Sequence, residues 1–285
     1  MGNLIKAVRC HRYAGLDEAD KPVPTPDPLR DVLALDEIPR PECEPGHVLV
    51  LTNYAGVQYP DALQAQGLYQ QKPSLPYVPG MDVTGTVLET GAGVERVAVG
   101  DRVIAQMSIG GLAEVVAVPA ESVWKAPDGV HLSKCANLGR NFFAAYHSLK
   151  IIGDVDAGAL VLVDGASGGV GMAAVQIAHH LGAEGYATAS EPKQDVLRGL
   201  GVAPDHIASS RTLEFAGTFA GAGIDVVLNA LSGEFVDASM GLLGDGGRFL
   251  EMGKTDIRDP ADLPDAITYR FFDLGAVDPH RIQQM

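Results

Sequence analysis

The sequence predicts an α/β protein in which a β-barrel-type domain is followed by a doubly wound parallel sheet. Up to about residue 125, short apolar runs alternate with Gly- and Pro-rich turns, which is typical of short antiparallel strands. From about residue 130 onward, strand-like runs alternate with helix-like segments, which indicates βαβ units and a parallel sheet. We therefore place the two domains at residues 1–127 and 128–285.

Length and charge agree with a two-domain globular chain and exclude some partners. The chain has 285 residues, of which 46% are hydrophobic and 20% charged. Its formal net charge is −15, and its 21 Lys and Arg residues are scattered rather than clustered. Nucleic acid and anionic membrane surfaces are thus excluded as expected partners, because both need a basic patch. No apolar run reaches the length of a membrane span.

Cysteine usage indicates a reducing compartment. Cys10, Cys43 and Cys135 are far apart and show no paired spacing, so they predict neither a disulfide framework nor a four-cysteine zinc lobe. The first residues, "MGNLIKAVRC", lack the apolar core of a signal peptide. We expect a cytoplasmic protein.

The elements of the first domain are predicted as short strands. Apolar patterns of four to eight residues favour strands in "GHVLVLTNYAGV", "VTGTVLET", "DRVIAQ" and "AEVVAVPA". Residues 91–103 predict a further short strand with a turn on either side. Residues 17–31 are rich in Pro and acidic residues, which indicates a solvated insertion.

The second domain begins with a segment of helical period, "SKCANLGRNFFAAYHSL". The predicted strands that follow are "ALVLVDG", "EGYATAS", "IDVVLNAL", "GRFLEMG" and "YRFFDL". The helices predicted between them are "GVGMAAVQIAHHLGA", "KQDVLRGLG" and "EFVDASMGLL".

One glycine-rich stretch, "VLVDGASGGVGMAA" at 161–174, indicates a phosphate-binding loop. It follows a predicted strand and opens a predicted helix, and its end fits the pattern Gly-x-Gly-x-x-Ala. Such glycines let a pyrophosphate approach the backbone at a helix N-terminus. The alternative is a tight turn in a packed sheet. The candidate cofactor-binding residues of this loop are Gly165, Ser167, Gly168, Gly169, Val170 and Gly171.

The end of the next strand favours NADPH over NADH. NAD-binding sites usually have an Asp or Glu there for the ribose 2′-hydroxyl, but residues 188–190 are Thr, Ala and Ser. Ser190 and Lys193, together with Arg211 further on, are candidate ligands of a 2′-phosphate. Solvated surface charge is the alternative for both cations, and Glu191 is an unfavourable acidic neighbour.

The sequence resembles two branches of one superfamily, over a stretch from about residue 4 to the end. In the second half, "GASGGVGMAAVQIAHHLGA", "DHIASSRTLEF", "DVVLNALSGEFVDAS" and "GRFLEMGKTDIRDP" resemble enoyl reductase domains of type I polyketide synthases. Within the first half, residues 56–105 are similar to quinone oxidoreductases of the same medium-chain dehydrogenase/reductase superfamily. The resemblance implies a GroES-like domain and a Rossmann dinucleotide-binding domain, with the active site in the cleft between them.

The resemblance includes zinc enzymes, but this sequence lacks their ligands. The Gly-His-Glu of zinc alcohol dehydrogenases has its counterpart in "PGMD", where Met81 and Asp82 replace the ligand pair. His179 and His180 fall in a predicted helix and are interpreted as partly exposed helix residues. We expect a zinc-independent reductase with no metal.

Several candidate roles come from the resemblance to enoyl reductases. It implies Tyr69, Lys254 and Asp273 as candidate proton donors, with Asp273 also able to orient Lys254. It implies Asn229 near the nicotinamide ribose, and Gln58 in place of a family Asn on the cofactor side. The alternatives are a packed tyrosine, a surface lysine and a cap at a strand end.

The sequence also departs from the family pattern. Pro60 replaces a usual basic residue, and Arg140 stands where an apolar residue is usual, able either to contact a phosphate or to disturb the pocket. The chain stops at "DPHRIQQM", whereas family members continue with a segment that completes the GroES-like sheet. We therefore expect an exposed sheet edge and association, as a homodimer or as a subunit of a larger complex.

Together these observations predict an NADPH-dependent reductase that transfers hydride to a C=C bond conjugated to a carbonyl. The expected substrate is an enoyl thioester, supplied free or by an acyl carrier or synthase module. The alternatives are a quinone oxidoreductase, an enone or alkenal reductase, and a non-catalytic nucleotide-binding subunit.

Overall fold

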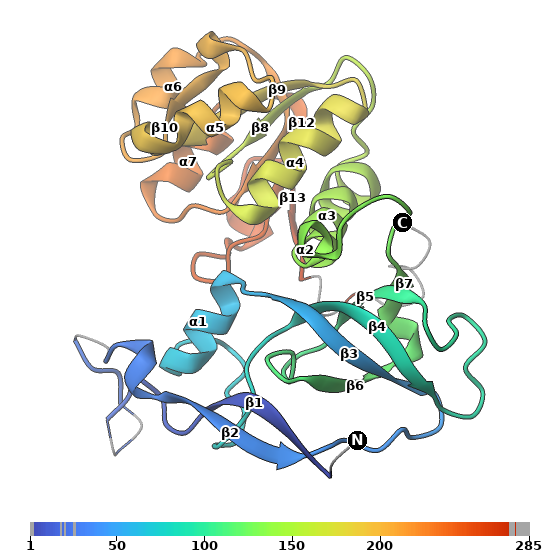
Figure 1. The fold of residues 1–285 in the computed structure, drawn as a ribbon. Helices are drawn as coiled ribbons and strands as arrows, with labels where there is room; N and C mark the ends of the chain where they lie inside the picture. Colours follow the sequence, from blue (N-terminus) through green and yellow to red (C-terminus); the bar gives the residue numbers. More distant parts are fainter. Residues whose placement is uncertain (1–2, 18, 20, 25–26, 274–276, 278–285) are drawn as a thin grey trace. The chain divides into compact units, whose positions relative to one another are not determined.

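A computed structural model describes residues 3–17, 19, 21–24, 27–273 and 277 of the chain. These residues form two compact units, Met1–Arg140 and Asn141–Met285 (Figure 1). Within the described ranges, no helix has both the length and the apolar character needed to cross a membrane.

The first unit is built on antiparallel sheets. A five-stranded sheet has the order β6-β3-β4-β5-β7, and a separate pair joins β1 to β2. Its strands are β1 Leu4–Cys10, β2 Leu33–Pro39, β3 His47–Gly56, β4 Asp82–Thr90, β5 Arg102–Gln106, β6 Val115–Pro119 and β7 Val123–Lys125. Its helices are α1 Tyr59–Gln66 and α2 Leu132–Cys135. Buried valines of β3, β4, β5 and β6 form one core, which confirms the predicted β domain.

The strand predicted within 91–103 is wrong. Residues 91–101 form a pair of turns, closed by Val94 N donating to Gly91 O at 3.3 Å and Asp101 N donating to Ala98 O at 3.0 Å, and Arg102 begins β5. Val97 is buried in the core, but the segment 91–101 forms no ladder with any described strand. Its apolar pattern therefore reflects a buried anchor in a loop.

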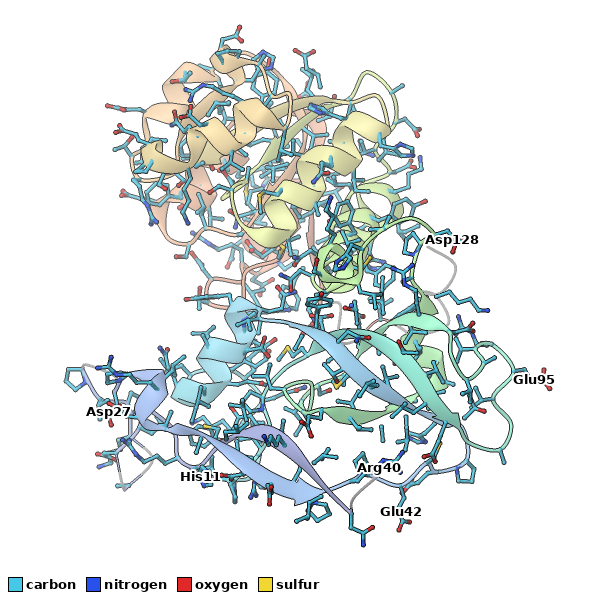
Figure 2. The ribbon with its side chains drawn as sticks, viewed as in Figure 1. His11, Asp27, Arg40, Glu42, Glu95 and Asp128 are labelled. Carbon is cyan, nitrogen blue, oxygen red and sulfur yellow. The ribbon has the colours of Figure 1, made fainter. Side chains whose placement is uncertain are left out.

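The predicted solvated insertion at 17–31 is mostly exposed where it is described. Asp27, labelled in Figure 2, forms an exposed ion pair with Arg12, with Oδ2 2.7 Å from Nη1. The strands β1 and β2 on either side of the insertion were not predicted from the sequence. They pair in register from Leu4–Pro39 to Cys10–Leu33.

The second unit is a doubly wound sheet, as predicted. Its six parallel strands have the order β10-β9-β8-β11-β12-β13. The strands are β8 Leu160–Val163, β9 Glu184–Ala189, β10 Ile207–Ser209, β11 Ile224–Asn229, β12 Leu243–Glu251 and β13 Thr268–Phe271. The helices are α3 Leu138–Tyr146, which continues as a π-helical turn His147–Ile152, α4 Gly169–His180, α5 Gln194–Gly199, α6 Glu214–Thr218 and α7 Glu234–Met240.

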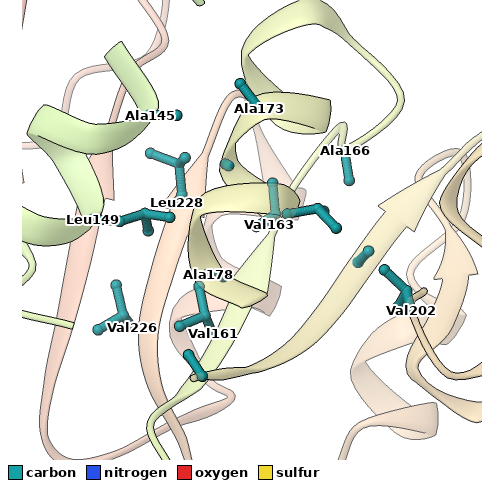
Figure 3. Close-up of a cluster of buried hydrophobic side chains, with 14 of the residues drawn as sticks. Ala145, Leu149, Val161, Val163, Ala166, Ala173, Ala178, Val202, Val226 and Leu228 are labelled. Atoms are coloured by element: carbon teal, nitrogen blue, oxygen red, sulfur yellow. The ribbon is translucent and has the colours of Figure 1, made fainter. Parts of the chain in front are cut away.

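Side chains alternate between the two faces of this sheet, and both faces are covered. One core joins β8, β9, β11 and β12 to α3, α4 and α5; Figure 3 labels its members Ala145, Leu149, Val161, Val163, Ala166, Ala173, Ala178, Val202, Val226 and Leu228. The opposite face packs Leu162, Val227 and Phe249 against Phe215 of α6 and Val236 of α7. A strand buried on both faces explains the unbroken apolar runs of the sequence.

The division between the units falls after Arg140, inside α3. It lies there because Leu132 and Cys135 of α2 pack against Ile104 of β5. A sequence boundary after residue 127 stays a proposal.

Candidate functional site

The loop between β8 and α4 is shaped by its glycines. Gly165 has φ +61°, a left-handed conformation that L side chains rarely adopt. A Cβ on Gly171 would lie 2.6 Å from Ala166 Cα, and one on Gly169 would lie 2.7 Å from Asn141 Nδ2. The helix therefore approaches the backbone of Ala166 more closely than a side chain at 171 would allow, whereas the space beside Gly169 is filled by the side chain of Asn141 in α3.

The N-terminus of α4 is open to an anion. Its N-cap residue is Gly168, and no side chain caps it. Gly168 and Gly169 are exposed, and Ser167 and Val170 are half-buried. Uncapped N–H groups at the start of a twelve-residue helix carry partial positive charge and bind phosphate groups. The residues present therefore fit the pyrophosphate of a dinucleotide.

The buried carboxyl group of Asp164 anchors this loop through hydrogen bonds. Asp164 Oδ1 accepts a hydrogen bond from Thr188 Oγ1 at 2.9 Å, and Asp164 Oδ2 accepts one from Ser239 Oγ at 2.7 Å. Thr188 Oγ1 in turn accepts a hydrogen bond from Gly165 N at 3.1 Å. Complete burial raises the pKa of Asp164 to about 6. The sequence reasoning did not identify Asp164 or Ser239, although an Asp between a buried strand and a glycine was a usable signal.

The two cations predicted for the 2′-phosphate lie at the same edge of the sheet. Ser209 of β10 pairs with Ala189 of β9, so Ser190 and Arg211 follow the carboxyl ends of neighbouring parallel strands. Lys193 N donates to Ser190 O at 2.8 Å, which closes a 3₁₀ turn at 191–193. The side chains of Lys193 and Arg211 are exposed, and neither forms an ion pair with any described residue. Both cations are thus available to a phosphate.

Asn229 and Glu251 link the carboxyl ends of β11 and β12. Both side chains are fully buried, and Asn229 Nδ2 donates to Glu251 Oε2 at 2.7 Å. Gly253 N donates to Glu251 Oε1 at 2.5 Å, and Leu231 N donates to Asn229 Oδ1 at 2.9 Å. Burial raises the pKa of Glu251 to about 7. The predicted ribose contact of Asn229 stays a prediction, and the structure gives its amide a role in holding two loops.

Lys254 and Asp273 form an ion pair beyond the carboxyl ends of β12 and β13. Lys254 Nζ lies 3.1 Å from Asp273 Oδ2 and donates to Phe272 O at 3.3 Å. The ammonium group also lies 4.5 Å from the ring centroid of Phe271. These contacts orient the lysine, whose side chain remains 24% exposed. The structure therefore brings together two of the three candidate catalytic residues.

The third, Tyr69, belongs to the first unit. It is half-buried in the segment after α1.

The first unit contains a polar cluster around Gln58. Gln58 Nε2 donates to Asp82 Oδ2 at 3.2 Å and to Asn137 Oδ1 at 3.3 Å. Asp82 also accepts from Gln106 Nε2 at 3.1 Å and from Arg140 Nε at 3.4 Å. Asp82 is 1% exposed, and burial raises the pKa of its carboxyl group.

The fold and this site define a class of protein. A doubly wound sheet with an uncapped, glycine-lined helix N-terminus, joined to an antiparallel β domain, is typical of nicotinamide-dependent oxidoreductases. The comparisons agree with this class. Residues 44–128 match the family model "Alcohol dehydrogenase GroES-like domain", and residues 169–273 match "Zinc-binding dehydrogenase".

Similar proteins and solved structures show to which group of oxidoreductases the chain is related. The chain is 47% identical over 249 residues to the pikromycin polyketide synthase component PikAII of Streptomyces venezuelae, a match that covers 85% of this chain and 6% of that protein. The crystal structure of CurK enoyl reductase has a TM-score of 0.85 at 30% identity and covers 100% of this chain and 84% of that one. The quinone oxidoreductase of Thermus thermophilus, solved also in complex with NADPH, has a TM-score of 0.74 at 30% identity over 94% of this chain and 80% of that one. The chain belongs to the medium-chain dehydrogenase/reductase superfamily of oxidoreductases.

The residues present do not fit the zinc ion that one family description names. Among the described residues, no group of three or more His, Cys, Asp or Glu side chains could hold a metal. Met81 is buried beside Asp82, and Cys10, Cys43 and Cys135 are all free. His179 and His180 are exposed in the last turn of α4.

Proposed function

We propose that this protein is an NADPH-dependent, zinc-independent reductase of a C=C bond conjugated to a carbonyl, with an enoyl thioester as substrate. The observation that carries the proposal is the Lys254–Asp273 pair at the carboxyl edge of a sheet whose first loop fits a dinucleotide. Ligands of open α/β sheets bind at this edge. The likeness to polyketide synthase components and to CurK enoyl reductase supports the substrate class.

The cofactor choice rests on charge. The uncapped N-terminus of α4 holds the pyrophosphate, and Ser190, Lys193 and Arg211 hold the 2′-phosphate. Residues 188–190 include no carboxylate that would repel that phosphate. When bound, NADPH supplies the hydride that the β-carbon of the substrate accepts.

The chain then has to supply a proton to the α-carbon. Lys254 is the donor in our proposal, because it is half-buried and oriented by Asp273 and the Phe272 carbonyl. Tyr69 is the second candidate donor.

Quinone reduction is the second candidate function. It is supported by the structural likeness to the Thermus thermophilus quinone oxidoreductase. Both reactions need the same cofactor site, and neither needs a metal.

We further propose that the protein works within, or together with, a larger synthase. The chain spans 6% of the length of the pikromycin synthase component and 4% of polyketide synthase GfsB. A substrate attached to a carrier would avoid the repulsion between a free acidic carrier protein and a chain of net charge −15. The three free cysteines support a reducing, cytoplasmic location.

Nucleotide titration followed by turnover tests the proposal. Intrinsic or nucleotide fluorescence is followed on addition of NADPH and of NADH, after which crotonyl-coenzyme A and then a quinone are added to the NADPH sample. Selective NADPH binding and oxidation driven by the thioester support the enoyl reductase. Oxidation driven only by the quinone supports the second candidate, and NADPH binding without either reaction supports a non-catalytic nucleotide-binding subunit.

A further inference from the structure

The carboxamide of Asn141 lies beside the phosphate-binding loop, and both belong to the second unit. Asn141, in α3, fills the space that a Cβ on Gly169 would take. That Cβ would lie 2.7 Å from Asn141 Nδ2 and 3.1 Å from Asn141 Oδ1. Gly169 is the first residue of α4 and follows the exposed N-cap Gly168. The carboxamide therefore lies at the end of the helix that fits a pyrophosphate.

Packing within the second unit fixes this position. Ala145, one turn after Asn141 in α3, is fully buried in the core that also contains Ala173 and Ala174 of α4. Phe142 packs against the same core. Because the two helices share one core, the contact between Asn141 and Gly169 follows from the fold of this unit alone.

The carboxamide of Asn141 forms no hydrogen bond with any residue that the structure describes, and it is half-buried. Asn is a favoured helix cap, because its side-chain oxygen accepts hydrogen bonds from the free N–H groups of a first turn. Asn141 does not cap α4 in this way, so those N–H groups stay available to another acceptor. The helix start and the adjacent amide thus offer several donors to a ligand rich in acceptor oxygens.

The loop itself contributes few side-chain donors. Between Gly165 and Gly171, Ser167 is the one residue with a polar side chain, and the segment contains no charged residue. A pyrophosphate is negatively charged and has acceptor oxygens on both of its phosphate groups, so a donor beside the helix start gains a charge-assisted hydrogen bond. An amide group supplies two N–H donors for this purpose.

We propose that Asn141 binds the pyrophosphate of the dinucleotide, with Nδ2 donating to a phosphate oxygen next to the N-terminus of α4. Asn141 is then a cofactor-binding residue that helps to position the nucleotide, and it takes no part in proton transfer. The inference rests on the proposed function. It adds a side-chain donor from α3 to a site otherwise built from the glycine loop, Ser190, Lys193 and Arg211.

The alternative is that Asn141 only packs against Gly169, and isothermal titration calorimetry with three ligands separates the two roles. NADPH, NADH and 2′-phospho-ADP-ribose all contain the pyrophosphate. NADH lacks the 2′-phosphate, and 2′-phospho-ADP-ribose lacks the nicotinamide. N141L keeps the branched shape of the asparagine side chain and removes its donor, whereas N141D replaces the donor by a negatively charged acceptor.

Q176A is the matched control. Gln176 is an exposed amide on the same helix, and its Nε2 donates to Met172 O at 2.9 Å, away from the loop. Urea unfolding without nucleotide shows whether each variant is folded as wild type is, so that a change in affinity can be assigned to the lost contact.

We expect N141L to raise the Kd about tenfold for each of the three ligands, which corresponds to the loss of one hydrogen bond to a charged group. N141D should raise each Kd further, because its carboxylate repels the phosphates. Q176A should keep the wild-type Kd values. The urea midpoint of N141L should stay near that of wild type, because the substitution nearly conserves the side-chain volume.

Three results would overturn the inference while leaving the proposed function intact. Wild-type Kd values in N141L would assign Asn141 to packing alone. A loss of affinity for NADPH and NADH but not for 2′-phospho-ADP-ribose would place the contact at the nicotinamide. A loss confined to the two ligands with a 2′-phosphate would place it there.

Failure of the proposed function is distinguishable from these results. If wild type binds the three ligands but reduces no crotonyl-coenzyme A, the proposed reaction fails and the inference on Asn141 is still decided by the Kd values. If wild type binds none of the three ligands, the cofactor site fails first and the inference fails with it.

Discussion

Replacing Gly171 by Ala tests whether the glycine loop is constrained by close backbone approach. The new Cβ would lie 2.6 Å from Ala166 Cα and 2.8 Å from the carbonyl carbon and oxygen of Ala166. These distances are shorter than ordinary van der Waals contact by roughly 1 Å. Because the atoms are backbone, the loop itself has to move, and overpacking of this kind costs about 1–3 kcal/mol.

Gly199→Ala is the matched control. Gly199 lies at the end of α5, and a Cβ there would meet nothing within 4 Å. Both variants replace a helical glycine and share the gain in helix propensity, about 1 kcal/mol. The difference between their unfolding free energies therefore isolates the clash, and it should be about 1–3 kcal/mol.

Urea unfolding followed by far-UV circular dichroism, without nucleotide, measures this difference. Gly171→Ala should also weaken NADPH binding, because the displaced Ala166 lies in the phosphate-binding loop. Equal unfolding free energies for the two variants would refute the reasoning, since they would show that the loop accepts a Cβ at 171.

Three further predictions concern the second unit. Lys193→Ala and Arg211→Ala should each raise the Kd for NADPH about tenfold, which corresponds to the loss of one charge-assisted hydrogen bond, and leave the Kd for NADH unchanged. An equal loss of affinity for both nucleotides in a fluorescence titration would contradict this. Lys254→Ala should lower kcat about 10²- to 10⁴-fold and Asp273→Asn by less, and unchanged steady-state rates would exclude the pair from proton transfer. Burial raises the pKa of Asp164 from 3.8 to about 6, so its contribution to stability is present below the unfolded pKa and is lost as the pH rises through the folded one. Asp164→Asn should remove that loss. The unfolding free energy of the variant minus that of wild type, measured by urea titration, should therefore rise by up to about 3 kcal/mol between pH 4 and pH 7. A difference that stays constant over this range would show that the carboxyl group does not titrate there.

Much of the second unit could be predicted because its signals are local. The glycine loop, the strand before it and the helix after it are contiguous, and the alternation of strands and helices defines a parallel sheet. Parallel strands also bring residues that follow them to one edge. The resemblance to enoyl reductases implied the pairing of Lys254 with Asp273, and the strand order explains how two residues that follow different strands meet, although 18 residues separate Lys254 from its backbone partner Phe272.

The contacts that hold the site could not be predicted, because they join residues far apart in the chain. Asp164 and Ser239 are 75 residues apart, and Asp82 and Arg140 are 58 apart. No local periodicity indicates such a pair. The strand prediction within 91–103 failed for a different reason. A single buried valine in a loop has the same apolar pattern as a short strand.

The most direct test of the central claim follows the hydride itself. NADPH carrying deuterium at the transferable position is incubated with the wild-type chain and crotonyl-coenzyme A, and the product is analysed by mass spectrometry and NMR. Our account predicts a butyryl thioester with one deuterium on the β-carbon and a solvent-derived hydrogen on the α-carbon. Oxidation of NADPH without labelled butyryl thioester, or no oxidation at all, would contradict it.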